Sequence, residues 1–501
     1  MITPRAKKEI YSRKRIEISK VLTVNTQGEV CEKVFKALEI FFKSTGISFT
    51  KADMQPDITL EVSEKLGDKT ERYNVAVNEK GIKLSFADFL GGRNAVATLY
   101  QLIRFENDSF YVLEAEIDDW ADNKMRGVLL DPARRFIPIK DLKDTFVRMA
   151  LSKMNVAHLH LMDFESYTLQ SHKYPQLNNP EHGFYKTEEM RDIVAFGQAI
   201  GIDCLPEIEM PAHTQPKMVE AFPFLLCETE TVDPCKWTMC IGNEKFYEFF
   251  ADIIAEVVDV FPYEVLHIGT DEFMNFCHEE RRHWPTWYDC KHCKALAKKL
   301  GIYQTPAEEV EKYKADGTLM ERGIAGIEEL FMHMVKRMHE IVTKAGKRMM
   351  MWNENINISK PCDLPKDILI HFWRVAMARR GPVYGCSMEK FLEQGFDVIN
   401  SHYPQTYIEE DIYYPDVPLN TWSPKTYPET KPELKDKILG GWPSAWSNYP
   451  HFAYTLPSAI AFYADRLWDE SVGYYGVDFC KSATRLVLGC PISPAPELSA
   501  P

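Results

Sequence analysis

Residues 265–273, VLHIGTDEF, place apolar and small residues directly before two adjacent acids, Asp271 and Glu272. A run of this kind predicts a strand buried on both faces, as in a parallel sheet that helices cover on both sides. The carboxyl end of such a strand opens into a crevice where ligands bind. An isolated Asp-Glu pair is more often a solvated loop or the start of a helix, because charged side chains are mostly exposed. The rest of the chain has to distinguish the two interpretations.

The same pattern, a short apolar run with a polar end, recurs along the chain after Met125. The predicted strands are 126–131, 155–163, 202–209, 263–272, 347–354, 368–373, 397–402 and 437–446. Segments with apolar residues three and four positions apart lie between them and predict helices over 139–154, 187–200, 243–261 and 326–346. Strand and helix in alternation over this length predict an α/β fold with a (β/α)8 TIM barrel, whose active site lies at the carboxyl ends of the strands.

A small α/β domain is predicted before the barrel. Its predicted elements are strands at 17–25 and 57–63, a helix at 32–46, a hairpin over 73–87 that turns at Asn78 to Gly81, and a closing helix at 92–103. The acidic stretch 114–124 marks its end. We therefore predict an N-terminal α/β domain over 1–118, a catalytic barrel over 119–490 and an irregular tail over 491–501.

The composition limits the partners of the chain. Its 501 residues have a net charge of -14, which argues against nucleic-acid binding, because that requires clustered Lys and Arg. No apolar run is long enough to span a membrane. Basic residues open the chain but no apolar segment follows them, so we expect no secretory signal and a cytoplasmic location. A neutral or small substrate fits this composition, and the oligomeric state is not indicated.

Acids and tryptophans gather at the predicted carboxyl ends of the barrel strands. They are Asp131, Asp163, Glu207, Glu209, Asp271, Glu272, Trp352, Glu354, Trp373 and Trp446. Pyranose rings stack their apolar faces on indoles, while carboxyl groups bind sugar hydroxyls and transfer protons. This combination predicts a carbohydrate substrate.

Six blocks of sequence occur in a characteristic order: MRGVLLDPARRF, ALSKMNVAHLHLMD, LPEIEMPAHT, LHIGTDEF, MMWNENI and GGWPSAWSNY. In these blocks the chain resembles glycoside hydrolase family 20, the β-N-acetylhexosaminidases, over about residues 60 to 470. The resemblance implies a small α/β domain followed by a (β/α)8 barrel. It also implies an exo-acting, retaining enzyme that releases terminal β-linked GlcNAc or GalNAc.

The resemblance assigns the chemistry to the acid pair after the fourth barrel strand. It implies Glu272 as the general acid and Asp271 as the residue that orients the 2-acetamido group of the substrate. The acetamido oxygen attacks C1 in place of an enzyme carboxylate and gives an oxazolinium intermediate. Glu272 must begin protonated, which predicts a raised pKa from burial or neighbouring acids. No cofactor is implied for catalysis.

The resemblance also implies a set of substrate-binding residues: Arg134, Asp163, His213, Trp352, Trp373, Tyr407, Trp446 and Asn448. Arg134 is expected to bind ring hydroxyls, although an ion pair with Asp131 is an alternative. Asp163 and His213 are expected to connect to the general acid, and the three tryptophans to wall the acetamido pocket. Tyr403 competes with Tyr407 for the tyrosine that binds the acetamido carbonyl.

Three positions depart from the family pattern. Thr270 replaces a glycine, Phe164 stands where a second aspartate is common, and Asn448 stands where a glutamate is common. These departures leave open an enzyme specialised for a modified or disaccharide-terminated glycan. Outside enzymes, the alternative is a catalytically weak sugar-binding barrel.

A cluster of cysteines follows the acid pair. Cys277, Cys290 and Cys293 occur near His278 and His292, and Cys227, Cys235 and Cys240 lie in the preceding barrel loop. The C-x2-C spacing suits a tetrahedral structural zinc ion held by Cys277, Cys290 and Cys293, with a fourth ligand from the preceding loop or a nearby His. A disulfide between these loops, which the resemblance allows, and free thiols are the alternatives.

Overall fold

The computed structural model describes most of the two predicted domains. The described residues are 2–230, 233–234, 236–272, 287, 289–303, 327–356, 358, 360–373, 387–403, 405–408, 422–426, 428–446 and 452–471. Asn448, Cys277, His278, Cys235 and the predicted tail 491–501 lie outside them.

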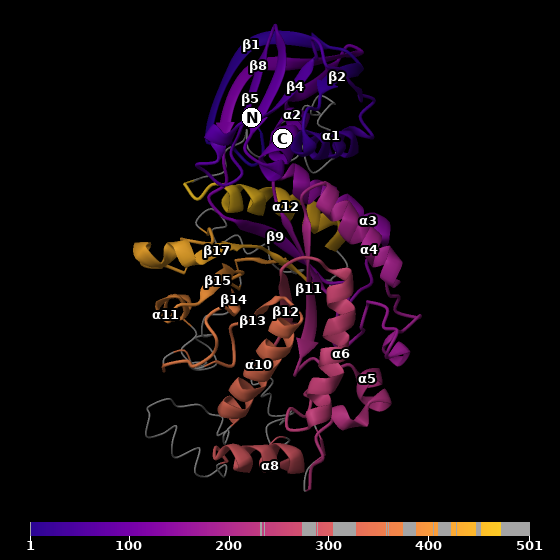
Figure 1. The fold of residues 1–501 in the computed structure, drawn as a ribbon, viewed down its shortest axis with the longest axis vertical. Helices are drawn as coiled ribbons and strands as arrows, with labels where there is room; N and C mark the ends of the chain where they lie inside the picture. Colours follow the sequence, from indigo (N-terminus) through magenta and orange to yellow (C-terminus); the bar gives the residue numbers. More distant parts are fainter. Residues whose placement is uncertain are drawn as a thin grey trace, which may run out of the picture.

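The N-terminal domain, at the top of Figure 1, is a mixed sheet with two helices on it. Its strands are β1 (Lys8–Ile18), β2 (Val21–Asn25), β3 (Ser48–Lys51), β4 (Ile58–Val62), β5 (Tyr73–Asn78), β6 (Gly81–Phe86), β7 (Ile103–Glu106) and β8 (Ser109–Asp119), and its helices are α1 (Glu29–Phe42) and α2 (Phe89–Leu102). The strand order is β1-β8-β5-β6-β4-β2-β3, with β7 paired to β8. The predicted hairpin is confirmed as β5 and β6, which close with Asn78 opposite Gly81.

Most of β1, and all of β3, β7 and β8, lie outside the predicted strands. Strand β1 has charged residues along its length and exposed or half-buried side chains, so it lacks the apolar pattern of a buried strand. Strand β8 runs to Asp119 and so takes in the first half of the acidic stretch 114–124. The domain limits at 118 and 119 stay a prediction.

Eight parallel strands close into a barrel, which confirms the predicted fold class. They are β9 (Met125–Leu130), β10 (Val156–His160), β11 (Asp203–Met210), β12 (Val265–Gly269), β13 (Arg348–Trp352), β14 (Leu369–Phe372), β15 (Asp397–Asn400) and β17 (Ile438–Gly441). Each strand pairs with the next, and β9 pairs with both β10 and β17. Two short strands, β16 (Tyr407–Ile408) and β18 (Ser444–Ala445), extend the sheet beside β9.

Helices surround the barrel in Figure 1. The four predicted ones are confirmed as α3 (Ile139–Leu151), α4 (Thr187–Ala199), α6 (Glu244–Val260) and α10 (Ile327–Lys344), and α5 (Pro216–Ala221), α8 (Lys291–Leu300), α11 (Met388–Glu393) and α12 (Phe452–Trp468) are also described. Helix α8 lies at the end of the molecule opposite the N-terminal sheet (Figure 1). No helix within the described ranges is both long and apolar enough to cross a bilayer.

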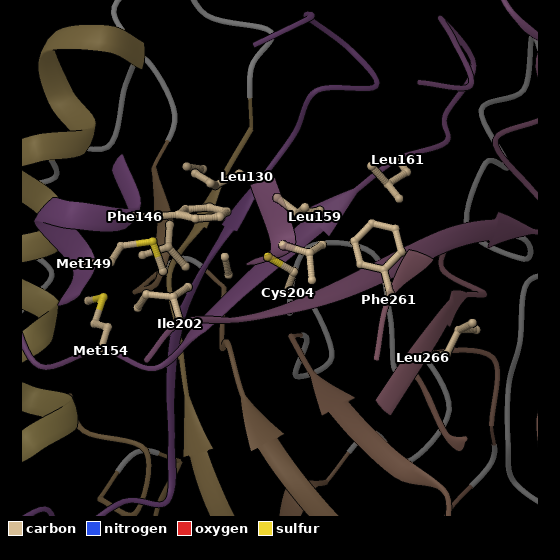
Figure 2. Packing of buried hydrophobic residues seen from close by; sticks show 14 of the residues in the cluster. Leu130, Phe146, Met149, Met154, Leu159, Leu161, Ile202, Cys204, Phe261 and Leu266 are labelled. Carbon is tan, nitrogen blue, oxygen red and sulfur yellow. The ribbon is translucent and has the colours of Figure 1, made fainter. Parts of the chain in front are cut away.

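Successive side chains of β9 face opposite sides of the barrel wall. Leu130 packs outward with Leu159 and Cys204 against Phe146 and Met149 of α3 (Figure 2). The side chain of the preceding residue, Leu129, belongs to a separate cluster in the barrel interior. Burial of an apolar side chain of this size contributes about 1.5–3 kcal/mol. Both faces of β9 are therefore apolar up to its carboxyl end, where the polar residues of the site begin.

Buried charges join the two domains. Lys153, at the end of α3, places its Nζ 2.7 Å from Asp119 Oδ2, and both side chains are fully buried. Arg126 of β9 lies 2.5 Å from Glu71. A buried charge without its partner is strongly destabilising, so these pairs hold the N-terminal domain in one position on the barrel.

Candidate active site

His213 joins the predicted acids at the carboxyl ends of β10, β11 and β12. Its Nδ1 lies 3.2 Å from Asp163 Oδ1, and its Nε2 lies 3.6 Å from Asp271 Oδ2 and 3.5 Å from Glu272 Oε2. Asp163 and His213 are buried, whereas the side chains of Asp271 and Glu272 are 14% and 28% exposed. The structure thus brings the predicted acid pair and its predicted partners together, with Asp271 and Glu272 reaching toward solvent.

The backbone that presents the acids is held in an unusual conformation. Thr270 has φ 87° and Glu272 has φ 52°, a region that side chains other than glycine rarely adopt and that costs about 1–3 kcal/mol per residue. Asn355 Nδ2 donates to Thr270 O at 2.7 Å, and the backbone N–H of Glu272 donates to Glu354 Oε1. The loop after β13 therefore fixes the conformation of the acid pair.

Neighbouring charges set the protonation of this cluster. Burial alone would lower the pKa of His213, but Asp163 and Asp271 outweigh it and raise that pKa well above its usual value. Burial raises the pKa of Asp271, His213 opposes the rise, and Glu272 adds to it. Burial and the charge of Asp271 raise the pKa of Glu209 well above its usual value. These shifts favour the imidazolium form of His213 and the protonated form of Glu209.

Asp271 keeps one acceptor for a further donor. Its Oδ1 is buried and has no hydrogen-bond partner among the residues that the structure describes. A buried polar atom is normally hydrogen-bonded, so this oxygen is placed to accept from an N–H or O–H group of a ligand.

Arg134 forms the ion pair with Asp131 that the sequence offered as an alternative, and a second ion pair with Asp163. Its Nη1 lies 3.1 Å from Asp131 Oδ2 and its Nη2 lies 2.7 Å from Asp163 Oδ2. The guanidinium also stands 4.6 Å from the ring centroid of Trp446. Burial would lower the pKa of Arg134, but Asp163 and Asp131 outweigh it and raise that pKa. Arg134 therefore remains charged at the edge of the pocket, and its contact with a sugar stays a prediction.

Four aromatic side chains form a wall beside the acids. Trp373 stacks on Tyr407, with centroids 5.7 Å apart at 16°. Trp446 meets Tyr407 at 5.8 Å and Trp352 at 6.4 Å, and Trp352 meets Trp373 edge-on at 6.4 Å. Tyr403 packs edge-on against Tyr407 at 5.1 Å. The predicted tryptophans and Tyr407 thus come from four different strand ends to one wall, and Tyr403 packs beside it.

A buried carboxylate supports this wall from the barrel interior. Glu207 Oε1 accepts a hydrogen bond from Trp352 Nε1 at 2.8 Å and lies 3.0 Å from His267 Nδ1. Its Oε2 lies 2.9 Å from His158 Nε2. Burial would raise the pKa of Glu207, but His267 and His158 outweigh it and lower that pKa well below its usual value. Glu207 is therefore an anion that fixes the indole of Trp352.

A second aromatic group packs on His213. The ring of Trp237 stands 4.5 Å from His213, and Phe164 stands 5.7 Å from Trp237. Phe164 is 39% exposed. Phe164 and Trp237 are thus connected to the acid pair through His213.

Groups of donor atoms that could hold a metal occur at two kinds of place. Cys227, Cys240, Cys290 and Cys293 form a buried set, and His158, Glu207 and His267 form another inside the barrel, each with ligand atoms within 4.8 Å of one another. A third set combines His160, Glu207 and Glu209. Glu207 belongs to both of the other sets and already accepts a hydrogen bond from Trp352. The four cysteines have no other role among the features described above.

Comparison with known proteins identifies the family. The catalytic domain of glycosyl hydrolase family 20 matches residues 124–470, which is more than half of the chain. The chain belongs to glycosyl hydrolase family 20. The resemblance seen in the sequence is confirmed, and the barrel described here is the catalytic domain of a glycoside hydrolase family.

Family 20 relatives are distant and some are longer. A β-hexosaminidase of Vibrio furnissii is 27% identical over 425 residues, 77% of this chain and 62% of that protein. One of Porphyromonas gingivalis is 27% identical over 321 residues, 59% of this chain and 37% of that protein. The chain therefore spans less than two thirds of either protein. The β-hexosaminidase subunit alpha of Mus musculus is 25% identical over 419 residues, 81% of this chain and 72% of that protein.

Solved structures of family 20 share the fold. An exo β-N-acetylglucosaminidase of Vibrio harveyi, in complex with N-acetylglucosamine, superposes with a TM-score of 0.78 at 21% identity, over 99% of this chain and 78% of that one. A β-N-acetylhexosaminidase of Bacteroides fragilis gives 0.74 at 18%, over 99% and 97%. At these identities the likeness concerns the fold.

Several residues of the family 20 site were not predicted as site residues. Glu207, Glu209 and Glu354 were noted only as acids at strand ends, and Asn355 and Trp237 were not singled out. Their neighbours are distant in sequence: 82 residues separate Glu272 from Glu354, for example. Such contacts depend on how the barrel closes and leave no local signal in the sequence. The left-handed conformation of Thr270 also explains why the family usually has glycine there.

Proposed function

We propose that the chain is an exo-acting, retaining β-N-acetylhexosaminidase that hydrolyses terminal β-linked GlcNAc or GalNAc by substrate-assisted catalysis. The observation that carries the proposal is the meeting of Asp271 and Glu272 at one imidazole, His213, beside an aromatic wall. Family membership supports the reaction class. The Vibrio harveyi enzyme with bound N-acetylglucosamine supports the sugar.

In the first step Glu272 donates a proton to the glycosidic oxygen. The acetamido carbonyl oxygen forms a bond to C1 while the bond from C1 to the leaving oxygen breaks. The Oδ1 atom of Asp271, which has no protein partner among the described residues, accepts the acetamido N–H. Positive charge develops on the acetamido group as the ring closes, and the carboxylate of Asp271 stabilises it.

In the second step the Glu272 carboxylate takes a proton from water as that water attacks C1. The bond from C1 to the acetamido oxygen breaks, and the sugar leaves with its original configuration. Two displacements at C1 give net retention. His213 contacts both acids and is held by Asp163. Its positive charge offsets the negative charge of the two acids when Glu272 changes protonation.

The aromatic wall supplies the space for the acetamido methyl group. Trp352, Trp373 and Trp446 meet around Tyr407, and each of these side chains is almost completely buried. An acetamido group held against this wall keeps its oxygen near C1, and restricting two reacting groups to one geometry is a large source of rate acceleration. Arg134, beside Trp446, faces the ring hydroxyls in this orientation.

We propose that catalysis needs no cofactor. The steps above use proton transfer by Glu272, charge stabilisation by Asp271 and the nucleophile of the substrate itself. A metal at the cysteine cluster would be structural, because the four thiols leave no open coordination position for a substrate.

The test compares three chromogenic glycosides on the purified chain. We expect 4-nitrophenyl GlcNAc and GalNAc glycosides to be hydrolysed with retention, and the glucoside, which lacks the nucleophile, to react slower by orders of magnitude. A thiazoline that mimics the cyclised intermediate should bind at least about 100-fold more tightly than free GlcNAc. Asp271→Asn should reduce kcat on both amino sugars.

Two results would contradict the proposal. Brisk hydrolysis of the glucoside, with a fluorosugar trapped on Asp271, indicates an ordinary two-carboxylate retaining enzyme. Binding of GlcNAc without hydrolysis of any of the three substrates indicates a sugar-binding barrel. If only a modified or disaccharide-terminated glycan is cleaved, the specialised alternative holds.

A further inference from the structure

Four cysteines from two barrel loops meet in one buried cluster. Cys227 and Cys240 belong to the loop after β11, and Cys290 and Cys293 begin helix α8. Their Sγ atoms all lie within 4.8 Å of one another. All four thiols are free and buried, with exposures from 0 to 3%. Two pairs separated by 50 residues or more thus converge on one point.

Two of the sulfur–sulfur distances are close to those expected around one tetrahedral ion. Cys240 Sγ lies 3.5 Å from Cys290 Sγ and 3.9 Å from Cys293 Sγ. Four sulfurs at about 2.3 Å from a zinc ion stand about 3.8 Å from each other. A disulfide requires about 2.05 Å, so these sulfurs are spaced for a shared ion.

We propose that Cys227, Cys240, Cys290 and Cys293 bind one Zn²⁺ ion as a closed, structural four-thiolate site. Each thiol gives up its proton on binding, and the four sulfurs complete the coordination. Cys290 and Cys293 were predicted ligands. A tetrahedral site is complete without Cys277, which lies outside the described residues, so two cysteines of the preceding loop take the remaining positions.

Main-chain contacts hold the two loops together around the cluster. Cys290 is the N-cap of α8 and Cys293 lies in its first turn, where the helix dipole favours thiolates. Cys240 N donates to Leu225 O at 2.7 Å. Gly242 packs so closely on α8 that a Cβ atom there would lie 2.5 Å from Cys293 N. The two loops are therefore held together at the cluster by their main chains as well as by the sulfurs.

The site ties the catalytic end of the barrel to α8. Trp237, three residues before Cys240, packs on His213, and its carbonyl accepts from Thr214 Oγ1 at 3.0 Å. Trp287 Nε1, three residues before Cys290, donates to Met239 O at 3.1 Å. An ion at the cluster would thus hold the ring beside His213 in place. This consequence for activity rests on the proposed function, but the metal site does not.

The experiment measures metal and coordination directly. Full-length protein, purified under reducing conditions without chelators, should contain about one zinc per chain by elemental analysis. Replacement of zinc by Co²⁺ should give the intense visible and near-ultraviolet bands of tetrahedral cobalt thiolate. Cys290→Ser and Cys227→Ser should each lose the metal. Cys31→Ser, at an equally buried cysteine of the N-terminal domain, should keep it.

The cobalt spectrum keeps the proposal testable if the serine variants do not fold, because it uses the unaltered chain. Strong chelation should lower Tm and raise KM for the glycosides, and added Zn²⁺ should restore both. Wild-type protein that contains no divalent metal and gives no thiolate band with Co²⁺ overturns the proposal. So does mass spectrometry that finds these four cysteines joined in disulfides. Neither result depends on hydrolase activity.

Discussion

Asn355 offers the sharpest test of how the acid pair is positioned. Its side chain is 2% exposed and donates to the carbonyl of Thr270, one residue before Asp271. Asn355 itself has φ 68°. Removal of the amide leaves a buried carbonyl unsatisfied, at a cost of about 1–3 kcal/mol. Substitution by alanine adds a further cost of about 1–2 kcal/mol, because alanine tolerates the left-handed conformation poorly. Substitution by glycine adds no such cost, because glycine adopts this conformation readily.

The two substitutions therefore separate backbone strain from the lost hydrogen bond. We expect Asn355→Gly to lower the free energy of unfolding by about 1–3 kcal/mol and Asn355→Ala by about 2–5 kcal/mol. Both should lower kcat about 100-fold, because a displacement near 1 Å at a catalytic group has effects of that size. The loss should be larger for a 4-methoxyphenyl than for a 4-nitrophenyl GlcNAc glycoside, since the poorer leaving group depends more on proton donation by Glu272.

Asn400 provides a matched control. It is also a fully buried amide at a strand end, and its Nδ2 donates to Pro424 O at 2.9 Å. Asn400→Ala should lower stability by a similar amount and leave the leaving-group dependence unchanged. Denaturant unfolding and kcat on both glycosides measure these effects. An Asn355→Ala protein with wild-type kcat on both substrates, or an Asn400→Ala protein with the same kinetic defect, would refute the positioning argument.

Three further predictions concern other parts of the molecule. Glu272→Gln should lower kcat by about 10²–10⁴ for poor leaving groups and less for activated ones; an equal loss on both contradicts its role as acid. Phe164→Ala should raise KM for diacetylchitobiose about 2- to 10-fold, because one ring contact is lost, and should leave KM for the methyl glycoside unchanged. Equal changes in the two KM values would show that Phe164 does not contact the second sugar. Burial lowers the pKa of His402 from 6.5 to about 4. The neutral imidazole therefore contributes its full stability above pH 6.5. As the pH falls through 4, the free energy of unfolding should decrease by about 3 kcal/mol. His402→Gln should flatten this acid dependence in thermal unfolding, and an unchanged pH profile would exclude His402 as its source.

The barrel was predictable because its strands have an unmistakable pattern. A strand such as β12 is completely buried, so apart from His267 its residues are apolar or small up to the point where the strand ends and the acids begin. Strand β1 shows the opposite case. It is an edge strand with alternating exposure and many charges, and its pairing with β8 depends on main-chain groups that the sequence does not distinguish.

The site was predictable to the extent that its residues follow strand ends. Asp163, His213, Asp271 and Glu272 do so, and the structure brings them together. Glu354 and Asn355 also follow a strand end, but their task is to hold the main chain of a neighbouring loop. That task depends on the left-handed turn at Thr270 and Glu272, which exists only in the folded chain. For the cysteines, the spacing identified one pair, and only the packing of α8 on the β11 loop selects the other.

The anion inside the barrel limits how the proposed acetamido pocket can be redesigned. A smaller residue in place of Trp352 would widen the wall for longer N-acyl groups, but it would also take away the indole N–H that Glu207 accepts. Loss of one donor to a buried charge costs about 1–3 kcal/mol or more, and water drawn in to replace it would occupy the space that the substitution was meant to create. A broader acyl specificity therefore requires two substitutions together, a smaller residue in place of Trp352 and a neutral residue in place of Glu207. A library of single substitutions at the aromatic wall will not contain this pair.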